Sequence, residues 1–160
     1  MIRQALTSRE AVLTGAVVLL IALISTRYPG FAAPGNLANV FNDTAPLILL
    51  ALGQMIVILT KCIDLSVAAN LALTGMVVAM LNTAAPGVPV VVIILLALAL
   101  GAVMGALNGL LVWKLSIPPI VVTLGTMTIY RGIIFLISDG AWVNAHEMSA
   151  SFKDLPRHVI

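Results

Sequence analysis

The sequence has 160 residues, of which 61% are hydrophobic and only 9% charged, with a mean hydropathy of +1.16 and a net charge of +2. A chain of this composition has too little polar surface to stay dispersed in water, so these values indicate an integral membrane protein. The basic residues are spread along the chain and form no stripe, which argues against binding to nucleic acid.

The apolar stretches are long and show no alternation of polar and apolar residues, so the predicted fold class is all-α. At this length the chain has room for about five transmembrane helices. The first predicted span covers about residues 11–25 and stops before the turn residues Pro29 and Gly30. Arg3 and Arg9 precede it, as in a signal peptide, but no small-x-small cleavage site follows. We therefore expect an uncleaved first span.

Residues 36–43, NLANVFND, place apolar side chains at helical spacing opposite polar ones. This pattern is typical of a helix that lies along the membrane surface, and a plain loop is the alternative. The second predicted span follows at about 45–60 and carries Gln54 in its body.

The stretch 60–76, TKCIDLSVAANLALTGM, places Lys61 and Asp64 between two apolar runs. A side-chain oxygen of Asp64 or Ser66 is predicted to accept a hydrogen bond from the free backbone N–H groups that begin the third span, at about 65–82. The apolar runs on both sides are shorter than the roughly 20 residues of a full span. The stretch is therefore either a transport site or re-entrant turn, or an ordinary capped turn on the cytoplasmic side.

The fourth predicted span, about 90–113, has small residues four apart on one face. Gly101, Gly105 and Gly109 in this row predict close packing against another helix. Asn108 lies beside the row, where its side chain could form a hydrogen bond across the packed helices or line a path.

The fifth predicted span, about 118–137, begins with two prolines, which fit the first turn of a helix. Arg131 lies well inside this apolar helix, where a guanidinium is costly unless it is paired, reaches the interface or faces a wet cavity. It is either a functional residue or a link between helices through backbone carbonyls. Asp64 is predicted on the opposite side of the membrane, so we do not expect it to pair with Arg131.

The distribution of basic residues predicts a cytoplasmic N-terminus, because the inner segments then hold four basic residues in short loops: Arg3, Arg9, Lys61 and Lys114. The outer side holds Arg27, together with Lys153 and Arg157 in the long outer tail, residues 138–160. The tail contains no closing element, so we expect the chain to be the front part of a longer protein.

No enzyme motif is recognisable in the sequence. His146 and His158 lack the spacing of a zinc-binding HExxH helix, and neither a GxSxG nucleophile nor a glycine-rich phosphate loop is present. Asp64 is the only acid within the predicted spans, whereas intramembrane aspartyl catalysis needs two. We therefore predict no catalytic residue, no metal site and no cofactor on this chain, and a conduit in place of an enzyme.

Two stretches, GQMIVILTKCIDLSVAANLALTGM and NGLLVWKLSIPPIVVTLGTMTIYRGIIFLISDGAWVNAHEMS, resemble permease subunits of bacterial ABC importers for simple sugars, in the ribose, xylose and autoinducer-2 branch. The segments CIDLSVAANLALTGM and GAWVNAHEMS are most similar to L-rhamnose permeases. The resemblance covers most of residues 44–149. Cys62 and Ala68 stand where family members usually carry glycine, in the pattern GIDLSVG, and this departure favours the rhamnose subgroup.

This resemblance implies that the chain is the N-terminal half of a roughly ten-helix permease in the bacterial inner membrane. Two permease copies would form the pore, each docked on a cytoplasmic ABC ATPase that holds ATP and Mg, and a periplasmic sugar-binding protein would deliver the sugar. The sugar would cross by alternating access along hydrogen-bonding groups. The candidate path residues are Gln54, Asp64, Ser66, Asn70, Asn108, Thr123, Thr126, Thr128 and Arg131.

Two rival hypotheses stay open at this point. In a self-contained secondary transporter Asp64 and Arg131 would couple transport to an ion, and in a membrane scaffold there would be no conduit at all. The polar groups of the path also have a plainer interpretation, because each can bond to its own helix backbone, which is the commoner case for threonine.

Overall fold

The computed structural model describes residues 9–154, which divide into two units, Met1–Leu52 and Gly53–Ile160. Within residues 9–154 there is no strand, and five helices are long and apolar enough to cross a membrane. These observations confirm the predicted all-α class and the five spans. Arg3, Arg157 and His158, on which part of the orientation and metal arguments rest, lie outside the described residues.

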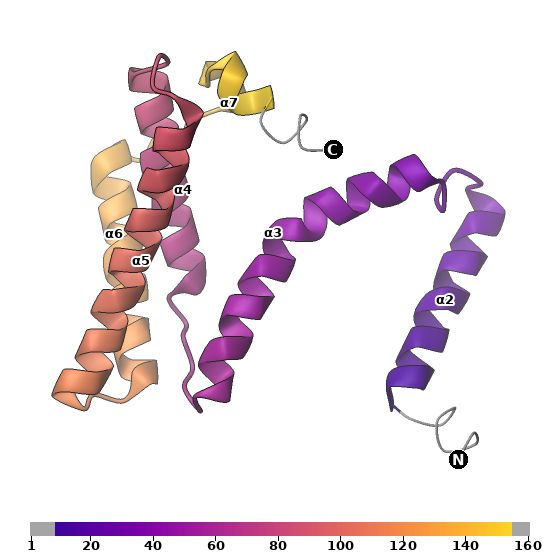
Figure 1. Cartoon of the computed structure of the whole chain (residues 1–160), viewed down its shortest axis with the longest axis horizontal. Helices are drawn as coiled ribbons and strands as arrows, with labels where there is room; N and C mark the ends of the chain where they lie inside the picture. Colours follow the sequence, from indigo (N-terminus) through magenta and orange to yellow (C-terminus); the bar gives the residue numbers. More distant parts are fainter. Residues whose placement is uncertain (1–8, 155–160) are drawn as a thin grey trace. The chain divides into compact units, whose positions relative to one another are not determined.

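The first unit contains α2 (Arg9–Arg27) and most of α3 (Pro34–Leu59), whose last turns belong to the second unit. Residues 36–43 form neither a separate surface helix nor a loop, because α3 runs through them without a break. The proline at the start of α3 suits the first helical turn, and Pro46 inside the helix removes one backbone donor without ending it. Figure 1 shows α3 as one bent helix. Helix α3 thus begins about eleven residues before the predicted second span, and the expectation of a separate surface helix or a loop was wrong.

The second unit is built around α4 (Val67–Ala84), α5 (Val90–Leu115) and α6 (Pro119–Ser138), which lie side by side with alternating direction (Figure 1). All three begin and end within about two residues of the predicted spans, because the apolar runs between polar turns set their lengths.

The core of the three-helix packing is small and buries Ala69, Leu73, Met104 and Tyr130. The Tyr130 hydroxyl donates a hydrogen bond of 3.1 Å to the Met104 carbonyl oxygen and so ties α6 to α5. The turn after α3, the end of α5 and the start of α6 meet at one end of this unit (Figure 1). Lys61 and Lys114 consequently lie at the same end.

The turn that ends α3 has a lysine where glycine is usual. Lys61 adopts a left-handed φ of 60°, and its N–H donates to the Ile58 carbonyl at 2.8 Å while the N–H of Cys62 donates to the Val57 carbonyl at 3.2 Å. This pair of bonds is a Schellman motif, which closes a helix C-terminus. Cys62 and Ala68, the two departures from the glycine pattern, have no positive φ, so neither position needs the freedom of glycine.

The left-handed position predicts how the turn tolerates substitution. Lys61→Val should lower the free energy of unfolding by about 1–2 kcal/mol, because a β-branched side chain clashes in this conformation. Lys61→Gly should change it by less than about 1 kcal/mol, since relief of strain offsets the entropy gained by the unfolded chain. Denaturant unfolding of the purified protein in detergent, followed by circular dichroism, measures both. Equal stability of the two variants would contradict the assignment.

After α6 the chain folds back onto α4 at the other end of the unit. This strap, which we define as residues 139–154, begins at the left-handed Asp139 and Gly140 and contains η1 (Ala145–Glu147) and α7 (Ala150–Asp154). Asn82 of α4 is 1% exposed and holds the strap with both amide atoms. Its Nδ2 donates to the Ser149 hydroxyl at 2.9 Å, and its Oδ1 accepts the Ser149 N–H at 2.8 Å.

A capping box orders η1 within the strap. The backbone N–H of Asn144 donates to Glu147 at 2.6 Å, which holds the pKa of that carboxyl below its usual value. A capping bond of this kind satisfies a backbone donor that would otherwise be free at the start of the short helix.

Candidate functional site

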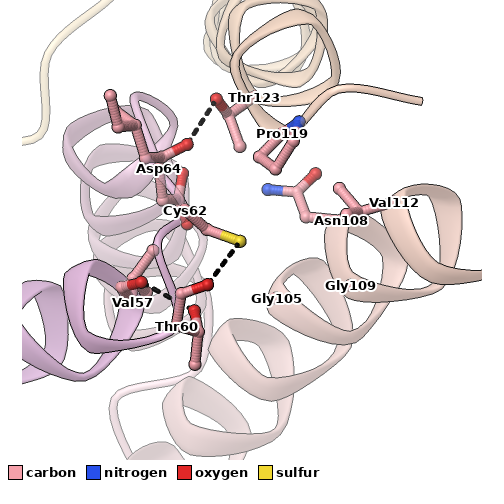
Figure 2. A pocket seen from close by; sticks show the side chains of 11 residues that line it. Val57, Thr60, Cys62, Asp64, Gly105, Asn108, Gly109, Val112, Pro119 and Thr123 are labelled. Atoms are coloured by element: carbon pink, nitrogen blue, oxygen red, sulfur yellow. Dashed lines mark hydrogen bonds between the residues drawn. The ribbon is translucent and has the colours of Figure 1, made fainter. Parts of the chain in front are cut away.

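An open pocket of about 220 Å³ lies where the last turn of α3, the second half of α5 and the first turns of α6 meet (Figure 2). Its wall combines apolar side chains with neutral hydrogen-bonding groups and one carboxylate. The lining residues are Val57, Thr60, Cys62, Ile63, Asp64, Gly105, Asn108, Gly109, Val112, Pro119 and Thr123. Among residues 9–154, no lysine, arginine or histidine lines it.

A chain of hydrogen bonds runs from the turn before α4 to α5. One carboxylate oxygen of Asp64, Oδ1, accepts both the Ser66 N–H and the Ser66 hydroxyl at 2.7 Å. Asn108 in turn donates its Nδ2–H to the Ser66 hydroxyl oxygen at 2.8 Å. Helix α4 begins at Val67, two residues after the predicted start, and within residues 9–154 no side chain caps it by a hydrogen bond. The predicted bond to Asp64 is formed by the N–H of Ser66, the residue before α4, and not by an N–H of the first helical turn.

The orientation of the Asn108 amide follows from this chain of bonds. The Ser66 hydroxyl has a single hydrogen, which it donates in the hydrogen bond to the Asp64 carboxylate. Toward Asn108 the Ser66 oxygen can therefore only accept a hydrogen bond. The group that faces Ser66 must therefore be the amide nitrogen, and Oδ1 points the other way. Asn108 is 5% exposed, and its Oδ1 has no hydrogen-bond partner among residues 9–154.

Two further bonds hold the turn that carries Asp64. Thr123 of α6, 4% exposed, donates to the Ile63 carbonyl at 3.4 Å (Figure 2). Gln54 donates its Nε2–H to the Asp64 carbonyl at 3.3 Å, while its own Oε1 is buried without a partner in the described part of the chain. The turn is therefore fastened to α3, α5 and α6 through backbone carbonyls and neutral side chains.

Four of the predicted path residues lie away from the pocket. Asn70 donates to the Gly101 carbonyl at 3.5 Å and so links α4 to α5. Thr126 and Thr128 donate to carbonyls of their own helix at 3.1 Å. Arg131 is exposed, and its guanidinium has neither a hydrogen bond nor an ion pair within the described part of the chain. The structure thus brings together Asp64, Asn108 and Thr123 at the pocket, with Gln54 and Ser66 bonded behind them.

Two of the three glycines in the row on α5, Gly101, Gly105 and Gly109, have no described neighbouring atoms on the side where a Cβ would lie. A Cβ atom added at Gly105 or Gly109 would meet no described atom within 4 Å, and one at Gly101 would meet only the Asn70 side chain, at 3.8 Å. Gly105 and Gly109 therefore keep one wall of the pocket open, and close approach of another helix to them stays a prediction.

Two of the polar pocket residues were not predicted from the sequence. Thr60 and Cys62 flank Lys61, and the Cys62 thiol contacts the Thr60 carbonyl at 3.6 Å (Figure 2). The available signal was their position in the polar break next to Asp64.

The second unit thus combines apolar helices of alternating direction with a partly polar pocket at one end. Residues 36–150 match the family described as "Branched-chain amino acid transport system / permease component". This match covers more than half of the chain, and the chain belongs to this family of permease components.

The chain is also similar to curated permease proteins. The chain is 40% identical over 129 residues to the ribose import permease protein of Escherichia coli K12, covering 81% of this chain and 40% of that protein. It is 39% identical over 155 residues to the autoinducer 2 import system permease protein of Enterobacter sp. strain 638, covering 96% and 44%.

A probable ABC transporter permease protein of Sinorhizobium fredii is 39% identical over 131 residues, which cover 82% of this chain and 38% of that protein. The chain thus spans about two fifths of the length of these relatives. No solved structure matches it significantly.

Proposed function

We propose that the chain forms part of the permease subunit of an ATP-driven importer that carries a monosaccharide across the inner membrane by alternating access. The observation that carries the proposal is the pocket in the second unit, whose buried polar groups are neutral and whose wall has no cationic side chain. Pockets of this kind bind neutral hydrogen-bonding molecules. The similarity to the ribose import permease supports a monosaccharide as the substrate.

The proposed importer has further parts. A cytoplasmic ABC ATPase would bind ATP and Mg and supply the energy, a periplasmic sugar-binding protein would deliver the substrate, and a second permease copy would complete the pore. The chain itself would have no catalytic role. Lys61 and Lys114 lie at the same end of the second unit. Because basic residues in short loops favour the cytoplasmic side, this location supports the predicted orientation with a cytoplasmic N-terminus.

We propose L-rhamnose as the sugar. The support is the likeness of CIDLSVAANLALTGM to rhamnose permeases, together with the position of Cys62, where related permeases usually carry glycine. Cys62 lines the pocket, so the departure changes the wall that the sugar would touch.

Uptake of radiolabelled L-rhamnose tests the function in cells that carry the complete transport system. We expect accumulation with the ATPase gene and none without it, because the energy would come only from ATP on the partner. Ribose in the same assay separates the substrate class from the particular sugar. Undiminished entry of rhamnose after deletion of the ATPase gene would contradict the proposal. A requirement for an ion gradient, lost in Asp64→Asn, would favour a secondary transporter.

A further inference from the structure

Arg131 places a charge on the exposed surface of an apolar helix that is long enough to cross the membrane. It lies 12 residues after Pro119 and seven residues before Ser138, the two ends of α6. At 1.5 Å per residue these separations are about 18 Å and about 10 Å, so Arg131 lies well inside a hydrocarbon layer of about 30 Å. A guanidinium at this depth is costly in lipid, and such residues almost always pair with another group or face a wet cavity.

The direction of α6 disfavours a position in which the Arg131 side chain reaches the nearer membrane surface. The nearer end of α6 is its C-terminus, whereas side chains on an α-helix lean toward the N-terminus. The Arg131 side chain therefore leans away from the lipid phosphates at the nearer end. Within residues 9–154 its guanidinium has neither a hydrogen bond nor an ion pair. The counter-charge has to come from outside these residues.

The exposed surface of α6 carries two stripes of different chemistry, each with residues at intervals of three and four. The polar stripe consists of Leu124, Thr128, Arg131 and Phe135. The apolar stripe consists of Ile129, Ile133 and Leu136. An apolar stripe suits contact with lipid. A stripe that includes a guanidinium suits contact with protein, where a polar partner is available.

We propose that the polar stripe of α6 is covered by another transmembrane helix, and that an aspartate or glutamate side chain of this helix forms an ion pair with Arg131. A carboxylate meets both needs of the guanidinium, because it neutralises the charge and accepts two parallel N–H bonds. A neutral amide or a backbone carbonyl would accept a bond and leave the charge in place. The inference does not depend on which substrate the transporter carries.

The helix with the acid is assigned to the part of the permease that this chain does not span. The chain has six acidic residues. Five of them are bonded elsewhere or lie at or beyond the ends of the spans: Glu10, Asp64, Asp139, Glu147 and Asp154. A second copy of this chain would therefore offer only Asp43, among the polar residues near the start of α3. The chain spans about two fifths of the length of its curated relatives, so permeases of this family have further chain for such a helix.

A photo-cross-linker in each stripe identifies the neighbouring segment. In membranes that contain the complete transporter, p-benzoylphenylalanine would replace Leu124 of the polar stripe, which is 43% exposed. We expect it to cross-link a permease peptide outside residues 1–160 that belongs to a helix with an aspartate or glutamate, as identified by mass spectrometry. Ile129 of the apolar stripe, 58% exposed, is the matched control position. The same probe there should not cross-link any peptide outside residues 1–160.

Charge variants test the ion pair itself. Arg131→Leu should leave the acid unpaired inside the membrane, and breaking a buried ion pair shifts an equilibrium by roughly a hundredfold or more. The amount of folded full-length permease, measured by size-exclusion chromatography after detergent extraction, should therefore fall steeply. Replacing the identified acid by leucine in the same variant should restore it, because neither charge is then left alone. Asp43→Asn is the control for a second copy and should change the amount by less than about twofold.

Each contrary outcome removes a defined part of the proposal. A Leu124 probe that cross-links no peptide outside residues 1–160 overturns the covered stripe. A cross-link to the segment around Asp43 of a second copy, or a steep loss in Asp43→Asn, overturns the assignment to the rest of the permease. An unchanged or larger amount of folded Arg131→Leu overturns the ion pair, since an arginine that faced lipid would only be relieved by leucine. Failure of the double variant to recover does the same.

Discussion

Replacing Asn82 by leucine is expected to release the strap from α4. Both amide atoms of Asn82 are bonded to Ser149, and the residue is 1% exposed, so no water replaces them. Losing the two bonds should lower the local opening free energy by about 1–3 kcal/mol. The open population would then rise about 5- to 150-fold. Limited proteolysis within residues 139–154 measures this rise, since cleavage follows the open population when opening is fast.

The control for this experiment is Ser151→Ala. Ser151 is exposed, and its hydroxyl lies 3.3 Å from that of Ser149, but it makes no bond to Asn82. Its cleavage rate should stay within about twofold of the parent, as for most exposed polar substitutions. If Asn82→Leu were cleaved as slowly as Ser151→Ala, the strap would be held by something other than Asn82.

Replacing Asp64 by alanine should have the second large effect, on the turn that opens α4. The variant loses two short bonds from Ser66 to a carboxylate, and charge-assisted bonds of this kind contribute about 1.5–3 kcal/mol. We expect the free energy of unfolding to fall by about 2–3 kcal/mol, since Asp64 is only half-buried. Asp64→Asn should cost less, because its amide oxygen still accepts one bond.

The same substitution should change the pocket. Asp64 lines the pocket itself, and without its carboxylate the Ser66 hydroxyl is free to donate to Asn108, so the Asn108 side chain in the pocket wall can turn. Sugar uptake should therefore fall more than the loss of stability alone explains. Denaturant unfolding in detergent and uptake in cells measure the two effects, with Asp43→Ala, an exposed acid of α3, as control. Equal stability of the two alanine variants would contradict the importance of the Ser66 bonds.

The helices of the second unit could be predicted closely because each is an apolar run between polar turns, which set its ends. Helix α3 could not. The polar residues before Pro46 suggested a separate element, but a proline removes a single backbone bond, and the helix continues on both sides of it. Local pattern does not show whether a helix bends or ends at such a residue.

The candidate site was less predictable, because it depends on which faces the packing brings together. Asn70 and Asn108 look alike in the sequence, each a lone amide in an apolar span. In the packed unit, Asn70 donates to the Gly101 carbonyl, whereas Asn108 donates to the Ser66 hydroxyl next to the pocket. Threonines were easier to judge, since Thr126 and Thr128 bond to their own helix, as threonines in apolar helices commonly do.

The unequal lengths of the three packed helices have a consequence for the surrounding lipid. At 1.5 Å per residue, the 18 residues of α4 and the 20 of α6 span about 27 Å and about 30 Å, close to the hydrocarbon thickness of about 30 Å. The 26 residues of α5 span about 39 Å. A bilayer that suits its neighbours obliges α5 to tilt or to protrude. Thinner membranes should therefore perturb this helix first, and with it the wall that Gly105 and Asn108 provide.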